Sequence, residues 1–243
     1  AIEGKEEIIG TLRESNYYDV LEGLTGVTLY EGKARFLSPE EIDVDGQILQ
    51  GRRFIIATGS TTRIIPFPGL AEAGYITNVE ALSLAKLPAS LVVIGAGPLG
   101  LEFAQMYRHF GSKVSVLEKE TQVLPREEPE VAAELQRCLE AEGISILTGA
   151  SIERVTREAG LKVVVVRIGK GTRRIEAEEL LMATGVAPNT KDLGLEHAGV
   201  TADKNGFIQV DETLRTSAGH IWAAGDVVGR MFLETVAAKE GSV

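Results

Sequence analysis

Six residues near the middle of the sequence have the types and the spacing that bind a phosphate-bearing ligand. The segment Gly95-Ala96-Gly97-Pro98-Leu99-Gly100 follows a short apolar run and opens a helix-forming stretch. In such a pattern Gly95 permits a tight turn, Gly97 lets the backbone approach a pyrophosphate, and Gly100 allows a helix to pack closely on a strand. The helix N-terminus offers free N–H groups to the phosphates. We therefore predict that residues 95–100 bind a dinucleotide.

An acidic residue about twenty positions further on favours one form of that dinucleotide. Glu118 ends the next apolar run, and Lys119 follows it. A carboxylate at this point accepts hydrogen bonds from both ribose hydroxyls and repels a 2′-phosphate. Glu118 therefore favours NAD(H) over NADP(H), and Lys119 is a further candidate contact. The alternative is that Glu118 is only a solvated acid at the end of a strand.

Two other acidic residues are candidates, each with an alternative that the sequence leaves open. Glu102 lies two residues beyond the last glycine and faces either the solvent or a nicotinamide ring. Asp226 follows Gly225 at the end of a predicted strand. Ligands of open α/β sheets bind outside the carboxyl ends of the strands, although Gly-Asp is also a common turn pair.

The composition excludes several classes of protein and site. The 243 residues carry a formal net charge of −10, which argues against a nucleic-acid-binding protein. No apolar run reaches the roughly 18 residues that a membrane span needs. The single cysteine, Cys138, excludes an internal disulfide, and we predict that it lies in the core with Val131 and Leu135. The three histidines are too widely spaced in the sequence to suggest a metal site.

The elements that position these residues alternate between strand and helix in the middle of the chain. A strand at 91–94, a helix from Leu99 to Phe110, a strand at 114–117, a helix from Pro129 to Gly143 and a strand at 144–147 follow one another. This order is typical of a parallel, doubly wound sheet. The sequence therefore predicts an α/β fold with a nucleotide-binding domain of the Rossmann type.

Antiparallel meanders are expected on both sides of this domain. Asp45-Gly46 is a strong hairpin signal between two of the runs at 27–30, 42–44, 47–49 and 54–56. A second antiparallel stretch runs from Val163 to Ile168, returns through Arg174 to Glu176 and ends with the run at 180–185. We also expect a weak helix in the first twenty residues, a helix at 79–87, a strand at 207–210 and a helix that begins near Leu233.

Four ordered motifs together resemble the two-dinucleotide flavoprotein disulfide reductases, which include lipoamide dehydrogenase, glutathione reductase and mercuric reductase. The matching segments span essentially the whole chain and occur in the order that the family shows. They are Ala57-Thr58-Gly59, the fingerprint Gly95 to Gly100 with Glu102, Ala183-Thr184-Gly185 with Pro188-Asn189, and Ala223-Ala224-Gly225-Asp226.

The resemblance implies a domain plan and a set of cofactor contacts. An NAD(P)H-binding domain, residues 67–185, is inserted in a discontinuous FAD-binding domain formed by residues 1–66 and 186–243. Glu102 would lie near the nicotinamide as the catalytic candidate, and Gly185 would approach NAD. The helix near Leu233 would direct its N-terminus at the flavin. The FAD contacts would be Ala34, Thr58, Gly59, Gly225 and Asp226.

Within the family, the segments Thr77 to Leu82 and Leu124 to Glu130 most resemble mercuric reductase. That resemblance implies hydride transfer from the nicotinamide to flavin, and then electron transfer through a cysteine pair to Hg(II). A disulfide reductase like dihydrolipoamide dehydrogenase is the alternative. A stand-alone NAD-binding module without catalysis is a second alternative.

The ends of the sequence, Ala1 and Val243, look cut, so we expect a fragment of a longer enzyme. The family's first FAD fingerprint and its redox-active cysteine pair have no counterpart in this sequence. We expect the chain to bind NAD(H), to bind FAD weakly or not at all, and not to reduce a substrate by itself. The intact protein would be a cytoplasmic homodimer.

Overall fold

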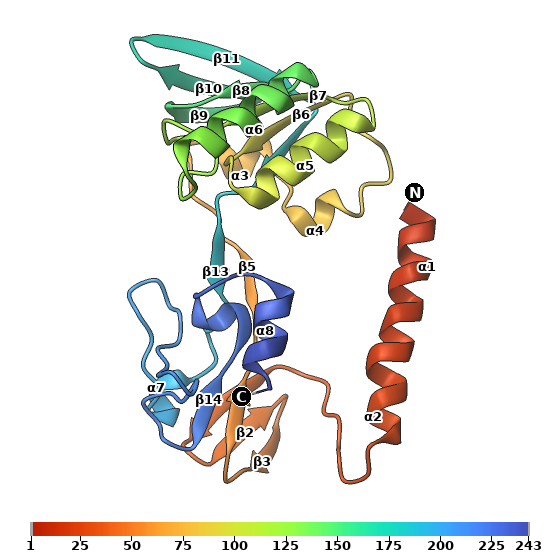
Figure 1. Ribbon diagram of the computed structural model, residues 1–243, viewed down its shortest axis with the longest axis vertical. Helices are drawn as coiled ribbons and strands as arrows, with labels where there is room; N and C mark the ends of the chain where they lie inside the picture. Colours follow the sequence, from red (N-terminus) through yellow and green to blue (C-terminus); the bar gives the residue numbers. More distant parts are fainter. Residues whose placement is uncertain (1, 243) are drawn as a thin grey trace. The chain divides into compact units, whose positions relative to one another are not determined.

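The structure is a computed structural model that describes residues 2–242. The chain divides into two compact units (Figure 1). The first consists mainly of Thr62–Gly185, and the second of Glu3–Thr61 together with the residues from Val186 onward. Each unit has its own hydrophobic core, so each is described by itself below.

The first unit is built on a four-stranded parallel sheet, as the alternation of strands and helices predicts. Its strands lie in the order β12 (Glu179–Met182), β6 (Ser90–Ile94), β7 (Lys113–Leu117) and β8 (Ser145–Leu147). Four of the five residues of β6 are buried, because a parallel sheet is covered on both faces. The predicted α/β fold with a parallel sheet is thereby confirmed.

Helices cover one face of this sheet and a second sheet covers the other. Residues of α5 (Pro98–His109) and α6 (Pro129–Ala141) share a core with β6 and β7. On the opposite face, the antiparallel sheet of β9 (Ala150–Glu158), β10 (Leu161–Ile168) and β11 (Gly171–Ala177) packs its valines against the parallel strands.

Several element predictions in this unit are wrong. The run at 180–185 does not end the antiparallel meander, because β12 pairs in parallel with β6. Strand β9 is missing from the prediction. The helix expected at 79–87 is only α4 (Asn78–Ala81), which follows α3 (Leu70–Ala73) and has a Thr77–Glu80 capping box. Pro88 disfavours a helical conformation at the residue before it, which works against a longer helix.

Cys138 is exposed, which contradicts its predicted place in the core. The buried face of α6 is formed by Ala132 and Leu139, with Leu135 half-buried. Val131 is 60% exposed, so the apolar stripe lies one residue out of phase with the prediction. Leu135 belongs to both possible stripes, and it does not distinguish them.

The second unit contains a three-stranded antiparallel sheet and a separate parallel pair. Strands β1 (Ala34–Ser38), β2 (Glu41–Val44) and β3 (Gln47–Gln50) form the sheet. The predicted hairpin at Asp45-Gly46 is confirmed, with φ of 49° and 96° at these two residues. Strand β4 (Phe54–Ile56) does not continue this meander, because it pairs in parallel with β14 (Ile221–Ala223).

Helices and loops make up the rest of this unit. The predicted N-terminal helix is present as α1 (Ile2–Arg13), the π-helical η1 (Glu14–Tyr18) and α2 (Asp19–Gly23), and the predicted run at 27–30 is not a strand. The strand expected at 207–210 is reduced to one bridge between Ala202 and Ile208. The remaining helices are α7 (Leu195–Ala198), the 3-10 helix η2 (Gly225–Val228) and α8 (Glu234–Glu240).

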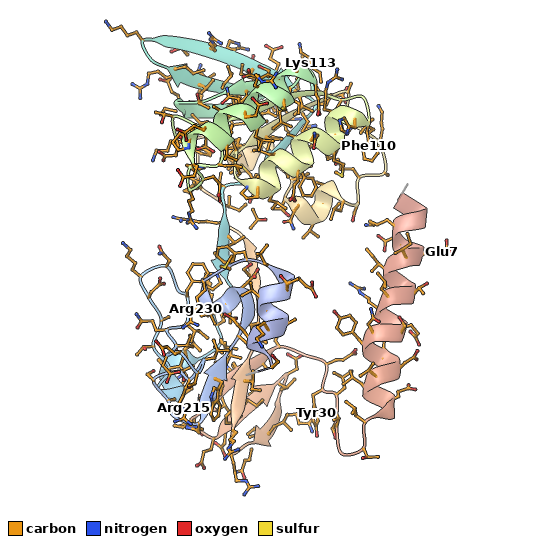
Figure 2. The ribbon with its side chains drawn as sticks, viewed as in Figure 1. Glu7, Tyr30, Phe110, Lys113, Arg215 and Arg230 are labelled. Atoms are coloured by element: carbon orange, nitrogen blue, oxygen red, sulfur yellow. The ribbon has the colours of Figure 1, made fainter. Side chains whose placement is uncertain are left out.

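Short strands mark the two places where the chain passes from one unit to the other. These are β5 (Ser60–Thr62) and β13 (Val186–Pro188), which pair with each other. In the second unit, the guanidinium of Arg215, a residue labelled in Figure 2, lies 5.2 Å from the centroid of the Trp222 ring and packs over it. Over residues 2–242, no helix is long and apolar enough to cross a membrane.

Candidate functional site

The predicted fingerprint forms the turn between β6 and α5 in the first unit. Gly95 has a φ of 106° and donates its N–H to the Leu117 carbonyl at 2.8 Å. A Cβ at Gly95 would overlap the carbonyl oxygen of Ala183, and one at Gly100 would overlap that of Gly95. The close packing of protein backbone therefore explains both of these glycines.

Gly97 is different, because nothing in the protein requires a glycine there. Its φ of −73° and ψ of 176° suit any residue, and a Cβ would meet no heavy atom within 4 Å. Gly97 is also the N-cap of α5, and it has no side chain that could cap the helix. The space above this residue lies at the positive end of a twelve-residue helix, where an anionic ligand is favoured.

Glu118 lies at the carboxyl end of β7 and is only 8% exposed. Its Oε2 accepts the N–H of Ala96 at 2.6 Å, and its Oε1 accepts the N–H of Glu120 at 2.9 Å. The carboxylate is thus bonded directly to the fingerprint loop. Since each oxygen has a second lone pair, the bound carboxylate retains acceptor capacity for ribose hydroxyls. Lys119 is exposed beside it.

A second loop contacts the fingerprint from the segment after Glu118. The N–H of Leu124 donates to the Ala96 carbonyl at 2.9 Å, so Ala96 is bonded at both its N–H and its carbonyl. Leu124 has a φ of 44°, which is uncommon for a residue with a branched side chain. The Gln122 side chain donates to the carbonyls of Leu124 and Glu127 and braces this turn.

The fingerprint helix α5 is tied to the end of α6 at its far end. Glu142 accepts two bonds from the Gln105 amide, at 2.9 and 3.0 Å, and lies 3.0 Å from Nε2 of His109. Arg108 donates to the Glu142 carbonyl at 2.8 Å. His109 therefore contacts the neighbouring helix. On the same helix, the side chain of Glu102 is exposed.

The end of β12 lies next to the fingerprint. Ala183 donates its N–H to the Ile94 carbonyl at 2.8 Å, directly before Gly95. Gly185 follows two residues later, with a φ of 96° and open space where a Cβ would be. Its carbonyl accepts the N–H of Arg63 at 2.9 Å, and Thr184 donates its hydroxyl to the Arg63 carbonyl.

In the second unit, the ends of β4 and β14 bring another group of predicted residues together. Ala224 donates its N–H to the Ile56 carbonyl at 3.0 Å, so the loops that follow both strands begin side by side. The Ser60 hydroxyl donates to Oδ2 of Asp226 at 2.7 Å. Asp226 therefore stands at the carboxyl end of a parallel strand, where the sequence places it. Ser60 is missing from the predicted site, although it directly follows Gly59.

The other predicted residues of this unit occupy nearby or separate positions. The carbonyl of Thr58 accepts the Asn189 side-chain amide at 2.9 Å. Gly59 has a φ of 69°, with nothing within 4 Å of an added Cβ. Ala34 begins β1 opposite Val44, in a different sheet from β4 and β14.

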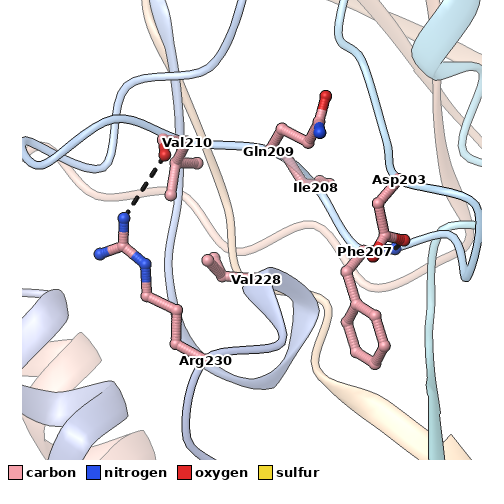
Figure 3. Close-up of a pocket in the computed structure, with 7 residues that line it drawn as sticks. All are labelled: Asp203, Phe207, Ile208, Gln209, Val210, Val228 and Arg230. Atoms are coloured by element: carbon pink, nitrogen blue, oxygen red, sulfur yellow. Dashed lines mark hydrogen bonds between the residues drawn. The ribbon is translucent and has the colours of Figure 1, made fainter.

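The second unit also contains a shallow pocket of about 280 Å³ (Figure 3). Its lining includes Asp203, Gln209 and Arg230, and the Arg230 guanidinium donates to the carbonyls of Val210 and Asp211. None of the predicted site residues lines it. Among the described residues, no three His, Cys, Asp or Glu side chains are grouped to hold a metal ion.

Comparison with known proteins agrees with this geometry. Residues 2–241 match a family described as pyridine nucleotide-disulphide oxidoreductase. A mercuric reductase of Bacillus cereus is 34% identical over 242 residues, which are 100% of this chain and 38% of that protein. A dihydrolipoyl dehydrogenase of Thermus scotoductus is 38% identical over 221 residues, 89% of this chain and 48% of that protein.

A solved structure shares the fold of this chain. The HOCl-induced flavoprotein disulfide reductase RclA from Escherichia coli matches with a TM-score of 0.91 and 31% identity. The match covers 100% of this chain and 55% of that one. The chain therefore spans about half the length, or less, of these relatives.

Proposed function

Because the chain belongs to the pyridine nucleotide-disulphide oxidoreductase family, we propose that it is the nicotinamide-binding part and a portion of the flavin-binding part of a reductase. Residues 67–185 would form the NAD(H)-binding domain, and residues 1–66 and 186–243 would contribute to the FAD-binding domain. The two compact units of the structure support this plan. The whole enzyme would extend beyond this chain.

The observation that carries the nicotinamide site is the open space at Gly97. Protein packing accounts for Gly95 and Gly100, but it does not account for Gly97. A pyrophosphate that approaches the backbone at the N-terminus of α5 supplies the missing reason. The site would be formed by Gly95, Ala96, Gly97, Pro98, Leu99 and Gly100, with Gly185 beside it.

We propose that the preferred cofactor is NAD(H). The Glu118 carboxylate is bonded to Ala96 and is therefore held against the fingerprint loop. It would accept the ribose hydroxyls and repel a 2′-phosphate. Lys119 would contact the same part of the cofactor. Glu102, exposed on α5, would lie near the nicotinamide.

In the second unit the residues fit a ligand that carries hydroxyl groups. Asp226 accepts one hydroxyl already, from Ser60, and Thr58, Gly59 and Gly225 surround the same pair of strand ends. We propose that these residues contact FAD, and that Ala34 contacts its adenine. Bound FAD supplies the redox chemistry, because it accepts a hydride from NADH.

The final acceptor of the electrons is proposed to be Hg(II), reached through a cysteine pair outside this chain. The similarity to mercuric reductases supports this assignment. A disulfide substrate is the second candidate, favoured by the dihydrolipoyl dehydrogenase relative, which is the more identical over its matched length. Assays of the whole protein with Hg(II) and with lipoamide distinguish these two candidates.

We further propose that this chain alone does not turn over either substrate, and that the intact enzyme is a cytoplasmic homodimer. The only cysteine, Cys138, is a single exposed thiol on α6, so the chain has no dithiol of its own. A stand-alone NAD-binding module without catalysis is the remaining alternative. In such a module the residues of the second unit would not contact flavin.

Mixing the intact protein with FAD and then with NADH in the absence of oxygen tests the proposal. The proposed function predicts that protein-bound flavin loses its visible absorbance when NADH is added. Flavin that binds but keeps its absorbance would contradict hydride transfer. Failure of the intact protein to bind flavin, together with normal NADH binding, would favour the stand-alone module.

A further inference from the structure

Glu240 makes a contact that the flavin site described above does not use. Its Oε2 accepts the backbone N–H of Gly225 at 2.7 Å. Glu240 is the last residue of α8, and Gly225 is the first of η2, fifteen residues earlier in the same unit. Figure 1 shows α8 beside the ribbon that follows β14. A charge-assisted bond of this length is among the stronger hydrogen bonds of proteins.

Two features of this contact call for a physical reason. An acidic side chain in the last turn of a helix lies at the negative end of the helix dipole, which is unfavourable. Gly225 has a φ of 78°, a conformation that other residues rarely adopt. A Cβ there would lie 3.4 Å from the Cβ of Ala237, so α8 leaves little room for a side chain at this turn. Helix α8 thus fixes the turn that begins η2.

The residue that this turn presents is Asp226. Its carbonyl accepts the N–H of Gly229 at 3.1 Å, which closes η2, and its Oδ2 accepts the Ser60 hydroxyl at 2.7 Å. A rotation of the peptide before Gly225 would move the Asp226 carboxylate away from the ends of β4 and β14. Because Glu240 occupies the Gly225 N–H, that N–H is not available to a ligand.

We propose that Glu240 is a positioning residue for the flavin site: its carboxylate holds the Gly225 turn so that Asp226 accepts hydroxyl groups of the ribityl chain. This inference rests on the proposed function, because it presumes that FAD binds at these strand ends. The role requires a hydrogen-bond acceptor at this position and does not require a negative charge. It therefore distinguishes substitutions that keep an acceptor from those that remove it.

The test compares Glu240→Ala with Glu240→Gln in the intact protein. The first variant removes the acceptor, and the second keeps an amide oxygen that can accept the Gly225 N–H. Titration with FAD, followed by flavin fluorescence, should show affinity about tenfold weaker in Glu240→Ala and within about twofold of the wild type in Glu240→Gln. Glu212→Ala, an exposed acid of the same unit, is the matched control and should bind FAD normally.

Amide hydrogen exchange in this chain supplies a second readout that needs no FAD. The Gly225 N–H should exchange faster in Glu240→Ala and should stay protected in Glu240→Gln. If Glu240→Ala does not fold, the same comparison is made with Glu240→Asp, whose shorter side chain should weaken both FAD binding and protection of Gly225.

The outcomes separate this inference from the proposed function. A wild type that binds FAD, together with a folded Glu240→Ala of equal affinity, overturns the inference alone. Equal losses in Glu240→Ala and Glu240→Gln also overturn it, because they assign the effect to charge. A wild type that binds no FAD contradicts the proposed flavin site, and with it this inference.

Discussion

Glu118 has two roles to consider: the proposed selection of the ribose, and the bonding of the surrounding loops. Its position after β7 suits it to select the ribose, and both of its oxygens also bind backbone amides of the surrounding loops. Because the carboxylate is buried and bonded, a substitution made to change cofactor preference should also loosen the fingerprint loop. If Glu118 selects the ribose as proposed, cofactor selectivity and local stability are coupled at this residue.

Replacement of Glu118 with Gln should show both effects. Without the negative charge the preference for NADH over NADPH should fall by about tenfold, which corresponds to about 1.4 kcal/mol. The new amide group turns a donor toward the N–H of Ala96 or Glu120, so the melting temperature should fall by a few degrees. Calorimetric titration with both cofactors and thermal unfolding measure the two effects.

The control for this substitution is Glu120→Gln. Glu120 is exposed two residues away, and the described bonds of Glu120 involve only its backbone. This variant should keep the preference for NADH and the melting temperature of the wild type. An unchanged cofactor preference in Glu118→Gln would show that the acid does not select the ribose.

Gly97 offers the cleanest separation of ligand binding from folding. Valine at this position meets open space and an ordinary backbone conformation, so the fold should be retained. The same side chain would occupy the path of the pyrophosphate, and NADH affinity should fall by about a hundredfold or more, at least about 2.7 kcal/mol. Gly219→Val, which also meets open space, is the matched control.

The results that contradict this prediction are specific. Normal NADH binding by a folded Gly97→Val would place the dinucleotide elsewhere. Loss of folding in Gly97→Val but not in Gly219→Val would mean that Gly97 has a structural role. Circular dichroism and calorimetry on the same samples distinguish these results.

Residue patterns brought out the residues of the candidate site better than the residues that bond to them. The spacing of glycines and the acid placed Gly95 to Gly100 and Glu118 together, because both follow adjacent parallel strands. Ser60 and Glu240 gave no comparable signal, since a hydroxyl or a carboxylate near a turn is common in any protein. Their roles depend on contacts 166 and 15 residues apart in the sequence.

At the scale of elements, Lys162 and Glu179 join the two sheets of the first unit. The Lys162 ammonium pairs with Oε1 of Glu179, and only 9% of its side chain is exposed. Burial, and to a smaller extent the charge of Arg157, its neighbour on β9, together lower the pKa of Lys162 to about 8. The ordinary value for a lysine is near 10.5.

This lowered pKa predicts a dependence of stability on pH. Between about pH 8 and 10.5 the unfolded chain keeps the Lys162 proton and the folded chain releases it, so the unfolded state binds more protons. The free energy of unfolding should therefore rise with pH across this window, by roughly 1 to 3 kcal/mol from this residue. Denaturant unfolding at several pH values measures the rise.

Lys162→Met supplies the reference for that measurement, because it removes the titrating group and keeps much of the side-chain volume. The rise attributed to Lys162 is the difference between the wild type and this variant. If the free energy of unfolding changed with pH in the same way in both proteins, the assignment of the rise to Lys162 would be contradicted. A larger rise in the variant than in the wild type would mean that Lys162 has the opposite effect on stability.

Elements were predictable where local pattern and tertiary environment agreed. Helix α5 and the β2–β3 hairpin follow from capping and turn residues that act locally. The phase of α6 did not, because Val131 and Ala132 are both apolar and only packing selects one of them. The pairing of β12 with β6 likewise joins strands about ninety residues apart, which no local run of residues indicates.

In the molecule as a whole, the proposed nicotinamide site lies in the first unit and the proposed flavin contacts lie in the second. The first unit has its own sheet, two covering layers and its own core, so it has the features of a domain that folds independently. In the second unit, the described candidate flavin residues other than Ala34 follow the strands of a two-stranded parallel sheet. We therefore predict that nicotinamide binding is less dependent than flavin binding on chain outside these residues.

Calorimetric titration of this chain with NADH, and separately with NADPH, is the decisive measurement for the proposed nicotinamide site. We expect one NADH site per chain and binding at least about tenfold weaker for NADPH, which is a difference of about 1.4 kcal/mol or more. Equal affinity for the two cofactors would contradict the role of Glu118. No binding of either cofactor by the folded chain would contradict the nicotinamide site itself.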